Sequence, residues 1–105
     1  MITSVKIGLF DYAVNEVDVP GGADKDLHAY IHFGSCKIEL RKDTNPDMKA
    51  VALLHEILHA IGRQSGLEYE GGDYTEEKFV IAFSHGLIAL LRDNPELVDY
   101  LRRKP

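Results

Sequence analysis

The sequence predicts a single α+β domain spanning residues 1–105, with strands first and helices after them. Two observations support this class. Before residue 42 many apolar residues are β-branched or aromatic and alternate with polar ones, which is typical of half-buried strands. After residue 45 the apolar residues recur with a helical period, and strands followed by helices indicate an α+β fold.

The composition excludes several classes of protein. A chain of 105 residues, 45% of them hydrophobic, can build one core but not two. The net charge of -5 argues against a nucleic-acid binder, and one cysteine cannot form an internal disulfide. There is no targeting signal and no run of about eighteen apolar residues, so we expect a cytoplasmic protein without a membrane segment.

The first half is expected to form an antiparallel sheet of three to four strands. Residues 5–19 are rich in valine and aromatic residues and end at Pro20, which fits one or two strands. The stretches 27–33 and 36–41 would form a hairpin. In the second arm apolar residues alternate with charged ones, so Cys36 is expected to fill the core from a strand.

The second half is expected to form three helices. Asn45 would cap the first, whose body over 48–61 is apolar on almost every side, and Gly62 would end it. A second helix is expected over about 76–92, because its apolar residues form one stripe. A short third helix would follow over about 93–103.

The most apolar helix carries His55, Glu56 and His59, which form the pattern H-E-x-x-H. Helical positions i and i+4 lie about 40° apart around the axis, so both imidazoles project from one side and can ligate one zinc ion. Glu56 lies about 100° from His55, where it can act on the attacking water as a general base. Burying these three groups without a metal would be costly. The sequence therefore predicts a zinc site.

A catalytic zinc site of this kind needs a third protein ligand, and several residues remain candidates. Glu77 and Glu76 begin the second helix, which can pack back across the first; helical periodicity does not choose between them. His85 lies two turns beyond Glu77, so both cannot ligate the same ion without distortion. We place Glu77 first, Glu76 second and His85 third. Two further carboxylates lie in the preceding loop, Glu68 and Glu70.

A peptide hydrolase also needs a hydrogen-bond donor for the oxyanion. His85 is expected to act there as a catalytic residue, and Tyr69 and Tyr74 are further candidates. The edge of the predicted hairpin could receive an extended peptide as an added strand. His28 and His32 lie on one face of its first arm and are expected at the surface.

The segments 54–61, 76–80 and 90–97, with the strand around 37–40, resemble a group of very small zincin-like proteins of phages and prophages. These are similar in pattern to the ImmA/IrrE-type metallopeptidases. The resemblance implies a minimal zincin-like fold, a zinc cofactor and an active-site helix followed by a ligand-bearing helix. In such gluzincin-like families the glutamate shortly before an aromatic-aliphatic pair is the third ligand, which favours Glu77.

The sequence thus predicts a zinc-dependent metalloendopeptidase, a hydrolase of a protein or peptide substrate, with Glu56 as general base. The intact Glu56 favours catalysis, because a purely structural zinc site has no need of that carboxylate. Two alternatives remain: a non-catalytic zinc-binding structural or regulatory module of phage or prophage type, and a metal-free interaction protein. We expect neither nucleic acid nor membrane as a partner.

Overall fold

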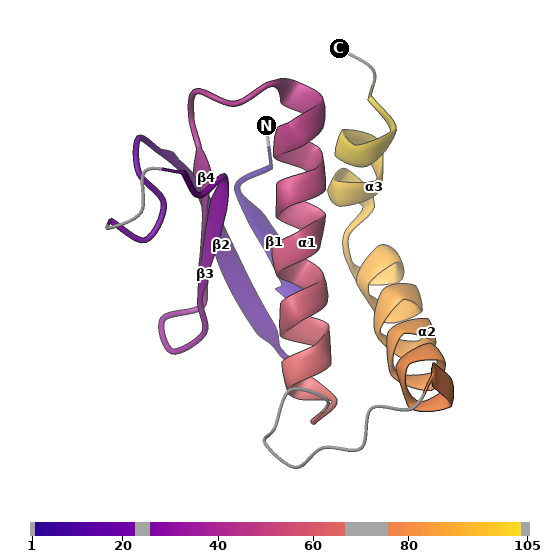
Figure 1. The fold of residues 1–105 in the computed structure, drawn as a ribbon. Coiled ribbons are helices and arrows are strands. Elements are labelled where there is room, and N and C mark those ends of the chain that lie inside the picture. The colour runs from indigo at the N-terminus through magenta and orange to yellow at the C-terminus, as the bar shows by residue number, and fades with distance from the viewer. Residues whose placement is uncertain (1, 23–25, 67–75, 104–105) are drawn as a thin grey trace.

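The computed structural model describes residues 2–22, 26–66 and 76–103, apart from the side chains at 76, 77, 80 and 81. It consists of a sheet followed by helices (Figure 1). The strands are β1 (Ser4–Ile7), β2 (Phe10–Val17), β3 (Ala29–His32) and β4 (Lys37–Arg41). The helices are α1 (Pro46–Gln64), α2 (Glu76–Asp93) and α3 (Pro95–Arg102). The α+β class is confirmed.

The sheet has the strand order β1-β2-β4-β3. The outer pairs β1–β2 and β3–β4 are antiparallel, as expected, whereas β2 and β4 pair in parallel. The expectation of a wholly antiparallel sheet was therefore wrong. The connection after β2 carries the chain past the neighbouring position to the edge, so β4 returns beside β2 in the same direction.

The turns of the two hairpins use left-handed backbone conformations. Gly8 follows β1 with φ +61°, which a residue without Cβ adopts easily. Cys36 precedes β4 with φ +52°. It was expected within a strand but lies in the turn, because the pairing of the arms begins only at His32 and Lys37. Its half-buried side chain still packs against the core, and its thiol donates to the carbonyl oxygen of Phe33 at 3.6 Å.

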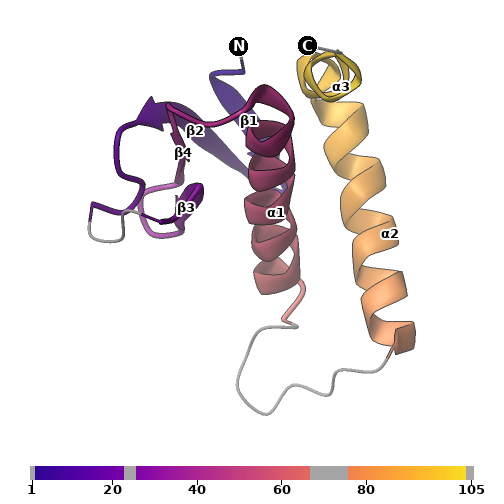
Figure 2. The same cartoon turned by 45° about the horizontal axis from the view of Figure 1, so that its top comes forward.

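The core lies between one face of the sheet and the helices. Alternate strand residues point inward, and α1 supplies the facing layer with Leu53, Ile57 and Ala60, all 0% exposed. Figures 1 and 2 both show α1 between the sheet and α2. The inward strand residues are Val5, Ile7, Tyr12, Val14, Ala29, Ile38 and Leu40. In the described part of the chain, no helix is long and apolar enough to cross a membrane.

The start of α1 agrees with the sequence, but its end does not. The Asn45 side chain accepts the N–H of Asp47 at 2.8 Å and caps the helix. At the other end α1 continues through the buried Gly62 to Gln64. Gly66, with φ +78°, takes the left-handed position after the helix, and its N–H donates to the carbonyl of Arg63.

A close contact between Gly86 and Ile61 fixes α2 against α1. A Cβ added at Gly86 would lie 2.5 Å from Cγ2 of Ile61, well inside van der Waals contact. The missing side chain therefore allows α2 to approach α1 at this level. The two helices run in opposite directions, as the chain colouring in Figure 1 shows.

Asn94, between α2 and α3, ties both helices to β1. It is 7% exposed, and its side chain accepts the N–H of Lys6 and donates to the carbonyls of Lys6 and Leu90, each at 2.8 Å. Its side chain makes no hydrogen bond to cap α3. The prediction that a helix starts at this position is correct. The asparagine side chain, however, bonds to β1 and does not cap the helix.

Gly86→Ala is expected to destabilise the protein by about 1 kcal/mol. Alanine favours a helix over glycine by about 1 kcal/mol, but overpacking against Ile61 costs about 1–3 kcal/mol. Urea denaturation measures the net effect. Ser84→Ala, at an exposed position of the same helix, is the matched control and should not lower stability. A stabilised Gly86→Ala variant would contradict the close contact.

Asn94→Ala is expected to lower the free energy of unfolding by at least about 2 kcal/mol. Three hydrogen bonds are lost, and the backbone groups of Lys6 and Leu90 that formed them are left without these partners. Asn15→Ala, at an exposed position of β2, should change stability by no more than about 0.5 kcal/mol. Equal effects of the two substitutions in denaturant titrations would exclude the tie to β1.

Candidate metal centre

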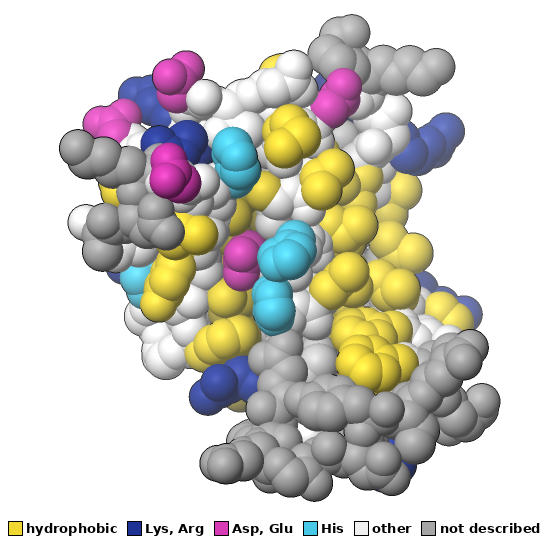
Figure 3. Space-filling view, in the orientation of Figure 1, with side chains coloured by type: hydrophobic (Ala, Val, Ile, Leu, Met, Phe, Trp, Pro, Cys, Tyr) yellow, Lys and Arg dark blue, Asp and Glu magenta, His cyan; other side chains and the backbone are white. Residues whose placement is uncertain are grey.

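The packing of α1 on the sheet determines where the H-E-x-x-H residues point. Leu53 and Ile57 face the sheet, and each histidine follows one of them by two residues, or about 200° around the axis. His55 and His59 therefore project away from the sheet, and both are exposed. The expectation that they would be buried was wrong, because they lie on the side of α1 opposite the sheet, so the cost of burial gives no reason for a metal. Figure 3 shows two histidine side chains in contact over α1.

The geometry of the two imidazoles suits a shared metal ion. Their ring centroids are 4.8 Å apart, and the Nε2 atoms of His55 and His59 are 3.1 Å apart. Two nitrogens bound to one tetrahedral zinc at about 2.0–2.1 Å lie about 3.3 Å apart. The pair therefore fits as two of its ligands. With one ring protonated at Nε2, the same separation is a hydrogen bond between the imidazoles.

Glu56 lies between the exposed histidines and the buried side of the helix. It follows His55 and precedes Ile57, so it is about 100° from each around the axis, and it is half-buried. A carboxylate in this position is next to the pair without being part of it, as a general base requires.

The described residues do not supply the third ligand. Among the side chains that the structure describes, which do not include those at 76 and 77, no group of three His, Cys, Asp or Glu residues is arranged to hold a metal ion. His85 is exposed on α2, and the structure does not bring it into a metal-binding group with the pair. The remaining candidates in the preceding loop lie outside the described residues: Glu68, Tyr69, Glu70 and Tyr74.

Glu76 and Glu77 form the start of α2, and their side chains also lie outside the described residues. The contact between Gly86 and Ile61 sets the level of their backbone. Glu77 precedes Gly86 by nine residues, which places it roughly 16 Å beyond His59 along antiparallel axes with a rise of about 1.5 Å per residue. Ligation by Glu77 remains a prediction, and it would require the first turns of α2 to lie nearer the pair.

β3 presents an open edge beside α1. Its only strand neighbour in the described sheet is β4, and α1 packs against it. The N–H of Arg41 donates to the carbonyl of His28 at 2.8 Å. Bonded and non-bonded residues alternate in an antiparallel pair, so the backbone groups of Ala29 and Ile31 point away from β4. This edge can accept another extended strand.

The two histidines near β3 are not part of the candidate centre. His28 is exposed, whereas His32 is half-buried and its Nε2 lies 2.9 Å from Oε1 of Glu39. The same Glu39 oxygen accepts the N–H of Gly21 at 2.9 Å. The hydrogen bonds from His32 and Gly21 hold the pKa of the Glu39 carboxyl below its ordinary value.

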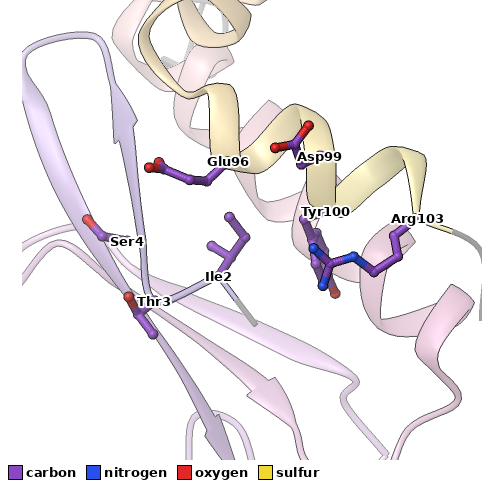
Figure 4. A pocket seen from close by; sticks show the side chains of 7 residues that line it. All are labelled: Ile2, Thr3, Ser4, Glu96, Asp99, Tyr100 and Arg103. Carbon is purple, nitrogen blue, oxygen red and sulfur yellow. The ribbon is translucent and has the colours of Figure 1, made fainter.

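A hollow of about 440 Å³ lies between the start of β1 and α3. Figure 4 shows that one side of it is formed by Glu96 and Asp99 of α3 and by Arg103, the C-cap of that helix. Ile2 and Ser4 lie on the opposite side. None of the H-E-x-x-H residues lines this hollow. It is therefore separate from the candidate centre.

Comparisons of the chain with protein-family models, with curated proteins and with solved structures find no match. The feature that indicates a metal centre is the exposed histidine pair of α1 and its geometry.

The ionised Glu39 should stabilise the fold, because its pKa is lower in the folded state than in the unfolded chain. This contribution is present above the ordinary pKa of the carboxyl and is lost as the pH falls through the lowered value. Glu39→Gln is therefore expected to reduce stability at pH 7 by about 1 kcal/mol or less, with the difference closing below about pH 4. Denaturant titrations of both proteins from pH 7 to pH 3 measure this; a constant difference would contradict it.

Proposed function

We propose that the protein is a zinc-dependent metalloendopeptidase that hydrolyses a peptide bond of a protein or peptide substrate. The observation that carries the proposal is the exposed histidine pair on α1, with its Nε2 atoms 3.1 Å apart. Glu56 follows His55 directly and is half-buried beside the pair. Two ligand nitrogens with an adjacent carboxylate form the donor set that zinc-assisted hydrolysis uses.

His55 and His59 would hold the zinc ion together with a third ligand, for which Glu77 is the first candidate and Glu76 the second. Bound zinc would polarise the scissile carbonyl and lower the pKa of the attacking water. Glu56 would hold that water, accept its proton and pass the proton to the leaving amine. His85 remains the candidate donor to the oxyanion, although it does not belong to a metal-binding group in the described structure.

The edge of β3 gives the substrate a place to bind. Backbone groups of Ala29 and Ile31 point toward the open side of the strand, and β3 packs against the helix that carries the histidines. An extended peptide paired with β3 would run beside α1. The proposal includes a cytoplasmic location, which agrees with the free thiol of Cys36.

The second candidate is a non-catalytic zinc module of phage or prophage type. In this alternative the metal helps to hold a small fold, since a chain of 105 residues can gain much of its stability from a bound metal. A purely structural role for zinc is harder to reconcile with the core, because the buried apolar cluster of the described residues does not include either histidine.

Glu56→Gln is expected to bind zinc as the wild type does and to lose at least about 100-fold in kcat/KM for peptide cleavage, because the proton acceptor is removed. His59→Ala should lose zinc but remain folded, since His59 is exposed. Metal analysis, thermal unfolding and cleavage of a peptide library measure these effects, with Glu77→Gln and Glu76→Gln testing the third ligand.

The outcomes separate the candidates. Zinc binding without any cleavage by the wild type would overturn the peptidase in favour of a zinc module. Cleavage that survives Glu56→Gln would overturn the role of Glu56 as the general base. Equal and negligible zinc in the wild type and in His59→Ala would exclude both. A melting temperature that falls sharply when zinc is removed would indicate a structural role for the metal.

A further inference from the structure

A second hollow, of about 650 Å³, lies at the C-terminal end of α1, where the β1–β2 and β3–β4 turns meet the helix. Its volume is within the range of about 300–1,000 Å³ that ligand pockets occupy. Part of its wall is apolar: Leu9, Phe10, Tyr12 and Phe33 contribute to it. Leu9 is 90% exposed and Phe10 52% exposed, so two large apolar side chains remain in solvent next to a cavity.

Arg63 gives this hollow a positive charge. Its guanidinium carbon lies 4.5 Å from the ring centroid of Phe33, so the cation stacks on the apolar wall. Among the described residues that line the hollow, none is acidic, and none of the ion pairs formed by described residues involves Arg63. A guanidinium that stacks on an aromatic ring and has no carboxylate partner among the described residues suits an incoming carboxylate, which it can bind through two parallel hydrogen bonds.

The hollow begins one helical turn beyond the candidate metal centre. Arg63 follows His59 by four residues, which corresponds to about 6 Å along α1 and about 40° around it. An extended peptide advances about 3.3 Å per residue. A peptide bound at the histidine pair would therefore reach the hollow within two or three residues.

We propose that this hollow binds a bulky apolar side chain of a polypeptide substrate, and that Arg63 binds a carboxylate next to that side chain. This inference rests on the proposed peptidase function and names its substrate class. The carboxylate is either the side chain of a following Asp or Glu or the C-terminal carboxylate of the substrate. The guanidinium can bind either carboxylate. The apolar wall favours burial of the bulky apolar side chain next to it.

Binding is tested in the Glu56→Gln protein, with and without zinc, so that turnover does not interfere. The probes are acetylated peptides with Phe-Glu, Phe-Gln or Ala-Glu before a C-terminal amide, and one that ends in Phe with a free carboxylate. Amide chemical shifts of Gly8 and Gly34 and the Kd values are the readouts. The Phe-Glu peptide, the free-carboxylate peptide or both should bind at least about tenfold tighter than Phe-Gln and Ala-Glu.

Two variants of this protein test the hollow directly. Arg63→Gln should weaken the carboxylate peptides about tenfold, to the level of the Phe-Gln peptide. Gly34→Leu should weaken every Phe-containing peptide, because a Cβ at Gly34 meets no atom within 4 Å and its larger side chain can occupy the hollow. Arg92→Gln, which removes an exposed arginine of α2, is the charge-matched control and should leave all Kd values unchanged. Thermal unfolding verifies the fold of each variant.

The results distinguish this inference from the function on which it rests. Kd values that are indifferent to Arg63→Gln and Gly34→Leu, or shifts that avoid Gly8 and Gly34, would overturn the hollow as a binding site. Cleavage by the zinc-loaded wild type without preference for an apolar residue beside a carboxylate would overturn the inference alone. Binding at the hollow with no cleavage by the wild type would overturn the peptidase and leave a peptide-binding site.

Discussion

The packing of α1 on the sheet is the constraint on which the candidate centre depends. Leu53 and Ile57 are 0% exposed, and full burial of each such side chain contributes about 1.5–3 kcal/mol. A helix with these residues against the sheet has its remaining positions set by the period of 3.6 residues. His55 and His59 are consequently exposed side by side, and Glu56 is left at the boundary between solvent and core.

The second half of the molecule is positioned by two contacts of different character. Gly86 allows a close approach of α2 to α1, whereas Asn94 ties the α2–α3 junction to the backbone of β1 through hydrogen bonds. One contact is steric and the other polar, and they act at different levels of α2. Together they determine the distance between the start of α2 and His59. That distance decides whether Glu76 or Glu77 can reach a metal ion held by the histidine pair.

Features that depend on residues close in sequence could be predicted. The cap at Asn45, the presence of three helices and the pairing of His55 with His59 follow from spacing within a few residues. The parallel pairing of β2 and β4 could not be predicted. It depends on the long connection after β2, which places β3 at the edge of the sheet and leaves the position beside β2 to β4. The hollow lined by Arg63 could not be predicted either, since it exists only where two turns that are distant in sequence meet α1.

The strand order has a consequence for how the molecule assembles. The strands of each outer hairpin are joined by a short turn, so pairing them costs little chain entropy. Pairing β2 with β4 joins residues that are distant in sequence, such as Ala13 and Lys37, and costs more. The hairpins and α1 can therefore form before β2 joins β4. A chain at that stage already carries both imidazoles on one helical face, but it has no hollow until the β1–β2 turn reaches α1. The histidine pair is thus formed by local helix geometry, whereas the hollow depends on the completed sheet.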